Sequence, residues 1–384
     1  MIFDFLEQAK SDEILPKEGD WLPNQLGANI EQSYKGKLEG EDFKLAIIGV
    51  GEDRSSNNNS GCGAGINKIR KELYSLFLHF DLPKTIDLGN IVLGHTIKDT
   101  QIALKMVVAE LLDLRITPII LGGGHDMTYG QYQAYENRIH AVDIVIIDER
   151  IDLLESEEVN AASFLRHIIM HQPNFLFSAN HLGHQLFYND PKNIDVLESL
   201  NFDVLRLGEV KKDIFEMEPL LRNADMLSFD LSALRSSDAP ANGITSPNGL
   251  SGEEACQLCR FAGYSNKTSS FGLYEFNPNF DQNNQGAKQA SQMIWYFIEG
   301  FANRKENDYP SENNSQFMKY YVKLESSAYE IVFWKSNYSN KWWMEVPQKG
   351  SELNKFIPCS YKDYENAMQD ELPDKWMKIY SKLN

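Results

Sequence analysis

The feature that most constrains the fold is an alternation of short, β-branched apolar runs with longer amphipathic stretches. Eight runs are suited to buried strands: residues 43–51, 85–91, 117–124, 141–149, 174–183, 202–210, 225–231 and 268–277. Helical periodicity falls between most of them, for example over 96–114, where apolar residues recur at spacings of three and four. Strands that alternate with crossover helices form a parallel sheet covered on both faces. The sequence therefore predicts an α/β fold of three layers (αβα) around a doubly wound, mainly parallel, eight-stranded sheet.

Both ends of the chain lie outside this alternation. The polar stretch after Arg304 (KENDYPSENNSQ) breaks the pattern and is predicted to be a linker. Beyond it, residues 317–346 are rich in Tyr, Trp and Val, which is typical of antiparallel strands, and a terminal helix is expected near 361–382. The predicted division is an N-terminal extension, a core domain and a small C-terminal α+β appendage, over residues 1–42, 43–305 and 310–384.

The charge balance limits the classes of partner. The net charge is −18 and the pI is about 4.9. An acidic surface repels phosphate backbones, so no nucleic-acid binding is expected. No apolar run reaches the ~18 residues that a membrane span needs, and residues 1–18 carry acids where a secretory signal carries basic side chains. We therefore expect no membrane partner and a cytoplasmic location.

Some cysteines and histidines have metal-like spacings. Cys256 and Cys259 form a CxxC, but it lies in a helical pattern without a second pair, and positions i and i+3 are expected to face the core. Zinc-like spacing also occurs in two histidine pairs, His167 with His171 and His181 with His184. These histidines lack a supporting third ligand and are expected to be surface or structural residues.

Titratable residues gather at the C-terminal ends of predicted strands. His125 follows TPIILGGG and Asp148 follows VDIVII, while Asp230 follows DMLSF and Glu275 lies in FGLYEF. Ligands bind at that edge of an open parallel sheet, because the loops there open a crevice. One such carboxylate is usually a helix cap, but four groups at one edge indicate a site. Histidine with carboxylates is a hard N/O ligand set suited to Mn, Mg, Zn or Fe.

The glycine run at 121–126 (LGGGHD) could also be read as a phosphate-binding loop. It lacks the Lys-Ser/Thr pair of a Walker motif, and its spacing is not GxGxxG. A simpler interpretation is that the glycines let the backbone turn sharply and aim His125 into the crevice. Phosphate binding is therefore not expected here.

These segments together resemble the arginase/agmatinase/formiminoglutamase (ureohydrolase) family. The resemblance lies in GGGHD at 122–126, in IDERID at 147–152, which is similar to the DAHxD motif, and in SFDLS at 228–232, which is similar to SFDxD. Three further segments match in order: 61–73 (GxxxGPxxIR), 239–251 (APGTG…PGGLS) and 275–278 (EVNP). The likeness runs from about 43 to 305, and several motifs in family order make it specific. It implies an arginase-like fold.

The resemblance implies hydrolysis of guanidinium or amidine C–N bonds by two Mn²⁺ ions that share a bridging hydroxide. Carried over by position, one ion would be held by His125, Asp148, Asp152 and Asp230. The other ion would share Asp148 and Asp230 and needs two ligands of its own. Those positions hold Arg150, where the family has His, and Ser232, where it has Asp. The expectation is one Mn²⁺ ion, with a metal-free site as the alternative.

Arg150 suggests how the altered site stays neutral. Three carboxylates, one divalent ion and one arginine sum to zero, as do four carboxylates and two ions. We hypothesise that the Arg150 guanidinium takes the place of the missing ion and donates to Asp148 and Asp230. The alternative is a plain ion pair without any metal, in which Ser232 is only a hydroxyl at a strand end.

Two further positions bear on the substrate. Glu275 matches the family glutamate that binds the cationic group of the substrate, and the alternative is a cap or loop carboxylate. The segment NAASF falls where the family has its substrate loop, which makes Asn160 and Ser163 candidate substrate-loop residues. The histidine proton shuttle of arginases is absent there, which favours a likeness to formiminoglutamase.

The resemblance implies a metal-dependent hydrolase of a small linear amidine or guanidino compound, with Asp148, Asp230 and Glu275 as catalytic residues. Activity is expected to be impaired or altered, because one ion activates water less than a bridged pair. Two alternatives remain: an inactive homologue that binds a ligand or partner in regulation or assembly, and a structural subunit that pairs with an active paralogue. Family members often form trimers or hexamers, so a homo-oligomer is the expectation.

Overall fold

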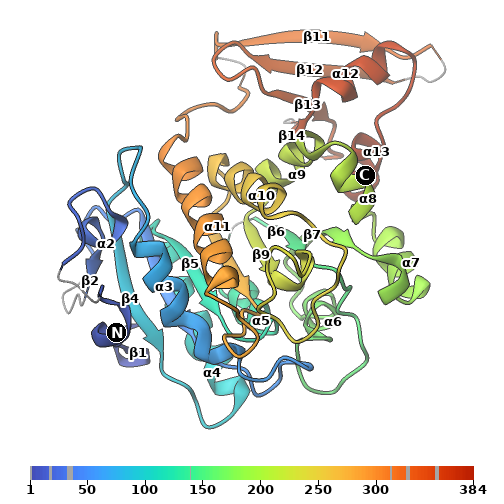
Figure 1. Cartoon of the computed structure of the whole chain (residues 1–384). Coiled ribbons are helices and arrows are strands. Elements are labelled where there is room, and N and C mark those ends of the chain that lie inside the picture. Colours follow the sequence, from blue (N-terminus) through green and yellow to red (C-terminus); the bar gives the residue numbers. More distant parts are fainter. Residues whose placement is uncertain are drawn as a thin grey trace.

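A mainly parallel sheet forms the centre of the molecule (Figure 1). The computed structural model describes residues 2–16, 20–32, 38–138, 140–311, 314–325, 329–350 and 354–384. Within them the sheet has ten strands, ordered β1-β4-β3-β5-β10-β9-β6-β7-β8, with β2 also paired to β4. All eight predicted strands occur in it: β3 (Leu45–Val50), β4 (Thr85–Ile91), β5 (Thr117–Gly122), β6 (Val142–Ile147), β7 (Leu176–His184), β8 (Val204–Arg206), β9 (Met226–Asp230) and β10 (Ser270–Tyr274). The predicted α/β class is confirmed.

The sheet differs from the prediction at both of its ends. Two short strands before residue 43, β1 (Leu6–Glu7) and β2 (Glu31–Gln32), pair with β4, so the N-terminal extension adds strands to the expected eight. At the other end, the predicted strand 202–210 is too long. The chain turns at Arg206 into helix α8 (Leu207–Lys212), because the Glu209 carboxylate accepts a hydrogen bond from the Arg206 N–H and caps the new helix.

Both faces of the sheet are buried. In β3, Ile47 belongs to one hydrophobic cluster, whereas the next residue, Ile48, belongs to another on the opposite face. The helices that follow the strands are α3 (Ile66–Tyr74), α4 (Ile97–Asp113), α5 (Met127–Gln133), α6 (Phe164–Ile169), α7 (Pro191–Ser199), α9 (Glu218–Asn223), α10 (Gly252–Tyr264) and α11 (Gln285–Ala302). Capping boxes start α4 and α10. In the described part of the chain, no helix is both long and apolar enough to cross a bilayer.

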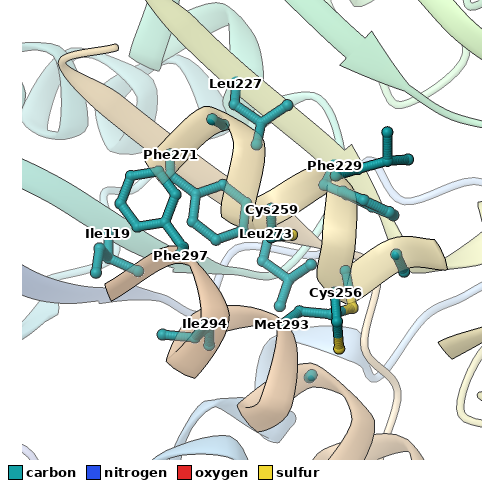
Figure 2. Packing of buried hydrophobic residues seen from close by; sticks show 14 of the residues in the cluster. Ile119, Leu227, Phe229, Cys256, Cys259, Phe271, Leu273, Met293, Ile294 and Phe297 are labelled. Carbon is teal, nitrogen blue, oxygen red and sulfur yellow. The ribbon is translucent and has the colours of Figure 1, made fainter. Parts of the chain in front are cut away.

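Helices α10 and α11 pack together over one face of the sheet, as Figure 2 shows. Phe271 of β10 lies against Phe297 of α11, with 4.9 Å between ring centroids. Cys256 and Cys259 of α10 belong to the same cluster, both as buried, free thiols. The interpretation of this CxxC as two core positions is confirmed.

The C-terminal segment forms a separate antiparallel sheet. Its strands are β11 (Phe317–Lys323), β12 (Glu330–Ser336), β13 (Trp342–Val346) and β14 (Lys355–Cys359), paired in that order. The predicted terminal helix is two helices, α12 (Tyr361–Met368) and α13 (Asp374–Leu383), because Asp370 adopts a φ of 68° and closes α12, with the Glu371 N–H bonded to the Asn366 carbonyl oxygen. Pro373 then directly precedes α13. Aromatic rings fill the core of this appendage; Trp342, for example, stacks on Tyr364. The domain boundaries near 42 and 305 stay predictions.

Candidate metal centre

Four of the predicted metal ligands meet at the carboxyl edge of the sheet. Asp230 is the last residue of β9, His125 lies just beyond β5, and Asp148 lies just beyond β6. Strands β5, β10, β9 and β6 are adjacent and parallel, so their carboxyl ends share one edge. Asp152, in the loop after β6, completes the set. These four residues, whose side chains we call the metal cluster, are at most 8% exposed.

The spacing within the metal cluster suits one ion. The Nδ1 atom of His125 lies 3.1 Å from Asp148 Oδ2, 3.3 Å from Asp230 Oδ2 and 3.5 Å from Asp152 Oδ2. Two atoms that bind one ion at ~2.1–2.2 Å, with angles of ~90–110°, lie ~3.0–3.5 Å apart. Nδ1 is buried and makes no hydrogen bond of normal geometry with any residue that the structure describes. The nitrogen of His125 and one oxygen each of Asp148 and Asp230 therefore lie close enough together to bind one divalent ion, and Asp152 lies beside them.

The other side of the imidazole ring holds it in this orientation. The Nε2 atom of His125 lies 2.9 Å from the Ser228 hydroxyl, which in turn is 2.7 Å from the hydroxyl of Thr128. The ring also packs against Phe164 and Tyr274, with centroids 4.5 and 5.6 Å away. A ligand histidine is commonly oriented in this way through its second nitrogen. The packing therefore aims Nδ1 at the three carboxylates.

The buried carboxylates of the metal cluster favour a positive charge next to them. Burial first, and then the neighbouring Asp148 carboxylate, raise the pKa of both Asp152 and Asp230. Burial also lowers the pKa of His125, but its contacts with the carboxylates outweigh burial and raise that pKa well above the usual range. Three acids in low dielectric are costly to ionise together, and a bound cation would remove that cost.

The two altered ligand positions lie beside the metal cluster. The Ser232 hydroxyl donates to Asp148 Oδ1 at 3.2 Å, and the backbone N–H of Ser232 donates to Asp230 Oδ1 at 2.6 Å. The Arg150 backbone N–H also donates to Asp148 Oδ1, at 3.0 Å. Both carboxylates thus have their Oδ1 atoms occupied by protein donors, which leaves the Oδ2 atoms facing His125.

The Arg150 side chain corrects the hypothesis drawn from charge counting. Its guanidinium lies over the ring of Tyr188, with Cζ 4.4 Å from the centroid, and its Nε is 3.3 Å from Oε1 of the buried Glu149. Among the described residues it forms no ion pair with Asp148 or Asp230. The predicted contacts with these two carboxylates are therefore wrong, because a neighbouring acid and an aromatic face attract the guanidinium instead.

A cavity of about 140 Å³ opens directly over the metal cluster. Its walls include three of the clustered aspartates together with Arg150 and Glu275, and the remaining lining comes from loops: Asn57, Asn58, Ala161, Ala162 and Ile244. Sites for drug-sized ligands start at ~300 Å³. The cavity therefore has room for the end of a small polar molecule rather than for a large ligand.

Glu275 faces this cavity from just beyond β10. Its carboxylate accepts hydrogen bonds from the His125 backbone N–H at 2.8 Å, from Asn59 Nδ2 at 2.7 Å and from the Ser56 hydroxyl at 2.9 Å. Its backbone φ is 65°, which is uncommon for a residue other than glycine. Burial and the nearby Asp230 raise the pKa of Glu275 to about 8. The site thus holds an acid in a defined orientation beside the metal cluster.

The loop at 160–163 contributes differently from the prediction. The Asn160 side chain accepts from the Ala162 N–H at 3.0 Å, and the Ser163 hydroxyl accepts from the Asn160 N–H at 3.0 Å, so both stabilise the loop itself. The cavity wall here comes from Ala161 and Ala162 instead.

Sequence reasoning missed the loop after β3. Ser56 and Asn59 hold Glu275, and Asn57 and Asn58 line the cavity. The sequence pattern could have indicated this loop, because the polar tract at 55–61 follows the buried strand β3 at the same sheet edge as the metal cluster.

The histidine pairs with zinc-like spacing have structural surroundings. The His181 ring nitrogen Nε2 lies 2.8 Å from the Arg150 carbonyl oxygen, and burial lowers the pKa of His181 to about 4. His167 and His171 both pack against Tyr129. Within the described residues, the cluster able to hold a metal is the one around His125, Asp148 and Asp230. The prediction that these four histidines are not metal ligands stays a prediction.

Comparisons with known proteins agree on one family. The profile of the arginase family matches residues 43–299. The chain is 26% identical over 287 residues to a formimidoylglutamase of Lysinibacillus sphaericus, which covers 71% of this chain and 89% of that protein. A formiminoglutamase of Trypanosoma cruzi, solved with Mn²⁺, superposes with a TM-score of 0.66 at 22% identity, over 73% of this chain and 99% of that one. For formimidoylglutamase of Bacillus subtilis the TM-score is 0.63 at 19% identity, over 69% and 89%. The profile match spans more than half of the sequence, and the chain belongs to the arginase family.

Proposed function

We propose that this chain is a metal-dependent hydrolase of C–N bonds in a small linear amidine or guanidino compound, similar to formiminoglutamase, and that it uses a single divalent ion, Mn²⁺. The observation that carries the proposal is the convergence of His125 Nδ1 with three aspartate oxygens, 3.1–3.5 Å away, beneath a cavity that Glu275 also lines. The formimidoylglutamase relatives support the same reaction class.

The residues around the cavity have separate tasks in this proposal. A bound divalent ion would lower the pKa of a coordinated water and orient it toward the amidine carbon. A carboxylate offers about four acceptor positions, and protein donors occupy three of them at Glu275. Glu275 also lines the cavity, where its carboxylate would accept a hydrogen bond from a cationic amidinium or guanidinium. Glu275 would therefore hold the substrate while Asp148 and Asp230 hold the ion.

We propose one ion because positions 150 and 232 offer no suitable ligand atom. The Arg150 guanidinium cannot bind a cation, and the Ser232 hydroxyl is already used as a donor to Asp148. The Arg150 charge nevertheless lies in the cavity wall, where it disfavours a second cation. A single ion is a weaker activator of water than a bridged pair, so turnover is expected to be slow.

Metal analysis combined with an activity screen tests the proposed function. Purified protein, loaded with Mn²⁺ and freed of excess ion, is expected to contain one ion per chain. Release of ammonia or formamide would then be measured with formiminoglutamate, arginine, agmatine and guanidinobutyrate. Turnover of at least one compound, abolished by a chelator and restored by Mn²⁺, is the expected result.

A second candidate function follows from the loss of both second-ion ligands. An inactive homologue would keep the metal cluster and bind a cationic ligand without hydrolysis. One bound ion without turnover of any of these compounds would favour this candidate over the hydrolase. Protein without metal after loading would contradict both.

Restoring the family ligands is expected to add a second ion. In the double variant Arg150→His with Ser232→Asp, the manganese content should rise from one to two ions per chain, because His and Asp supply the missing ligands and a cation leaves the cavity wall. Elemental analysis after gel filtration measures this content.

The matched control for the double variant is Arg206→His with Ser199→Asp. It makes the same two changes at exposed positions outside the metal cluster, and it should retain one ion per chain. A double variant at 150 and 232 that still holds a single ion would contradict the assignment of these positions.

A further inference from the structure

A second cavity lies between the core and the C-terminal appendage. Its volume is about 370 Å³, and it shares no lining residue with the cavity over the metal cluster. One wall comes from α9 and from the segments that follow α10 and α11, and the other comes from β13 and β14 of the appendage. Figure 1 shows β14 beside α9 at this junction. Any molecule bound here would contact both parts of the chain.

The lining of this junction cavity is basic although the chain is acidic. Five cationic residues line it, and they are Arg222, Lys267, Lys305, Lys341 and Lys355. Among the described residues that line it, Asp308 is the one acid, in a chain whose net charge is −18. A concentration of positive charge in a cavity favours negatively charged ligands.

Some of this charge is already paired inside the protein. Nζ of Lys267 contacts the carboxylates of Asp143 and Asp225, at 2.5 and 3.2 Å. Nε of Arg222 lies 3.0 Å from Glu218. The binding capacity of the cavity therefore depends on the donors that these acids leave free.

Arg222 keeps one such donor although it is 7% exposed. Its Nη2 donates to the carbonyl oxygens of Trp342 at 3.0 Å and Cys359 at 3.3 Å, and its guanidinium stacks on Trp343 with Cζ 4.3 Å from the ring centroid. Its Nη1, in contrast, is buried and has no hydrogen-bond partner in the part of the chain that the structure describes. A buried, unpaired donor on a cation is unfavourable, and an anion in the cavity would satisfy it once the guanidinium turns toward the cavity.

Lys355 and Lys341 add to this site. Nζ of Lys355 lies 3.3 Å from the ring centroid of Phe177, and among the described residues it has no carboxylate within ion-pair distance. Lys341 reaches Glu218 only at 3.4 Å, and Glu218 already pairs with Arg222. Burial lowers the pKa of both lysines. A negatively charged ligand would offset the cost of burying these ammonium groups.

We propose that the junction cavity binds a small organic anion, in which a phosphate or carboxylate group contacts Arg222, Lys341 and Lys355 and a flat apolar body packs on the aromatic wall. That wall consists of Tyr264, Tyr309, Trp343 and Phe356. Oxyanions match the planar donors of arginine, and aromatic faces suit a planar body. Binding would link the appendage to the core and stabilise their contact.

Titration calorimetry of the full chain tests this site with defined probes. Phenyl phosphate and benzoate carry the two anionic groups on the same ring, and at least one of them is expected to bind with one site per chain. The stronger of the two identifies the preferred group. Inorganic phosphate should bind more weakly because it lacks the ring, and benzylamine, with the opposite charge, should not bind. Failure of both anions to bind, or equal binding of benzylamine, would overturn the proposal.

Two variants locate the binding. Lys355→Met and Lys341→Met, made separately, keep the apolar stem and remove one charge, and each should weaken binding at least about tenfold, as expected for a charge-assisted contact. The control Lys362→Met removes an exposed lysine of α12 outside the cavity and should leave the affinity unchanged. Circular dichroism verifies that each variant is folded. Unchanged affinity in a folded Lys355→Met or Lys341→Met protein would place the anion elsewhere and overturn the proposal.

Discussion

Replacement of Asp230 by alanine is expected to prevent binding of the proposed metal ion and, with it, the proposed hydrolysis. Asp230 supplies one of the three carboxylate oxygens around His125 Nδ1, at 3.3 Å, and it ends a central strand that cannot shift to compensate. Loss of a residue that only hydrogen-bonds to a metal ligand lowers metal affinity or activity ~10–100-fold. Loss of a ligand itself should therefore lower both by more than about 100-fold. Elemental analysis and initial rates of ammonia or formamide release measure the two effects.

The matched control for Asp230→Ala is Asp42→Ala, which removes an exposed carboxylate away from the sheet edge and should keep both metal and activity. Asp230→Asn preserves the shape of the side chain and should also lose metal, which separates loss of charge from loss of packing. A folded Asp230→Ala protein that retains one ion per chain would contradict the assignment of the metal cluster.

Of the substitutions proposed for this protein, Asp87→Ala should cause the largest loss of folding stability. Asp87, in β4, forms a buried ion pair with Arg70 of α3, with Nε–Oδ2 at 2.8 Å and Nη2–Oδ1 at 3.1 Å, and it also accepts a hydrogen bond from Tyr74. Arg70 is 0% exposed, so the substitution would leave its charge unpaired in the core. The free energy of unfolding should fall by ~3–5 kcal/mol. Urea denaturation followed by fluorescence measures this change.

The position of this ion pair explains the expected size of the effect. The variant Asp42→Ala, which removes the exposed ion pair with Lys44, should change folding stability little, because water screens that pair. Replacing both buried partners, as in Arg70→Met with Asp87→Leu, should recover part of the loss, because no unpaired charge remains. An Asp87→Ala protein as stable as the parent would show that the charge of Arg70 finds another partner.

Much of the fold could be predicted because it depends on local patterns. The runs at 45–50 and 118–121 are apolar at successive positions, and only a sheet covered on both faces buries all of them. Parallel strands bring their carboxyl ends to one edge, which is why His125, Asp148 and Asp230 could be expected together before any distance was known. Errors occurred where one pattern allows two structures, as at Leu207, which continues an apolar run but begins a helix.

The sequence by itself determined which residue types stand at the sheet edge, and with them the proposed donor set of the metal cluster and the proposed loss of two family ligands at positions 150 and 232. Only the tertiary structure decided where long side chains point. Tyr188 lies 38 positions after Arg150, yet its ring holds that guanidinium away from Asp148. Ser56 and Asn59 reach Glu275 across more than 200 residues, and Arg222 meets Trp343 across the junction. Periodicity follows from neighbouring residues, whereas these contacts depend on how distant segments pack.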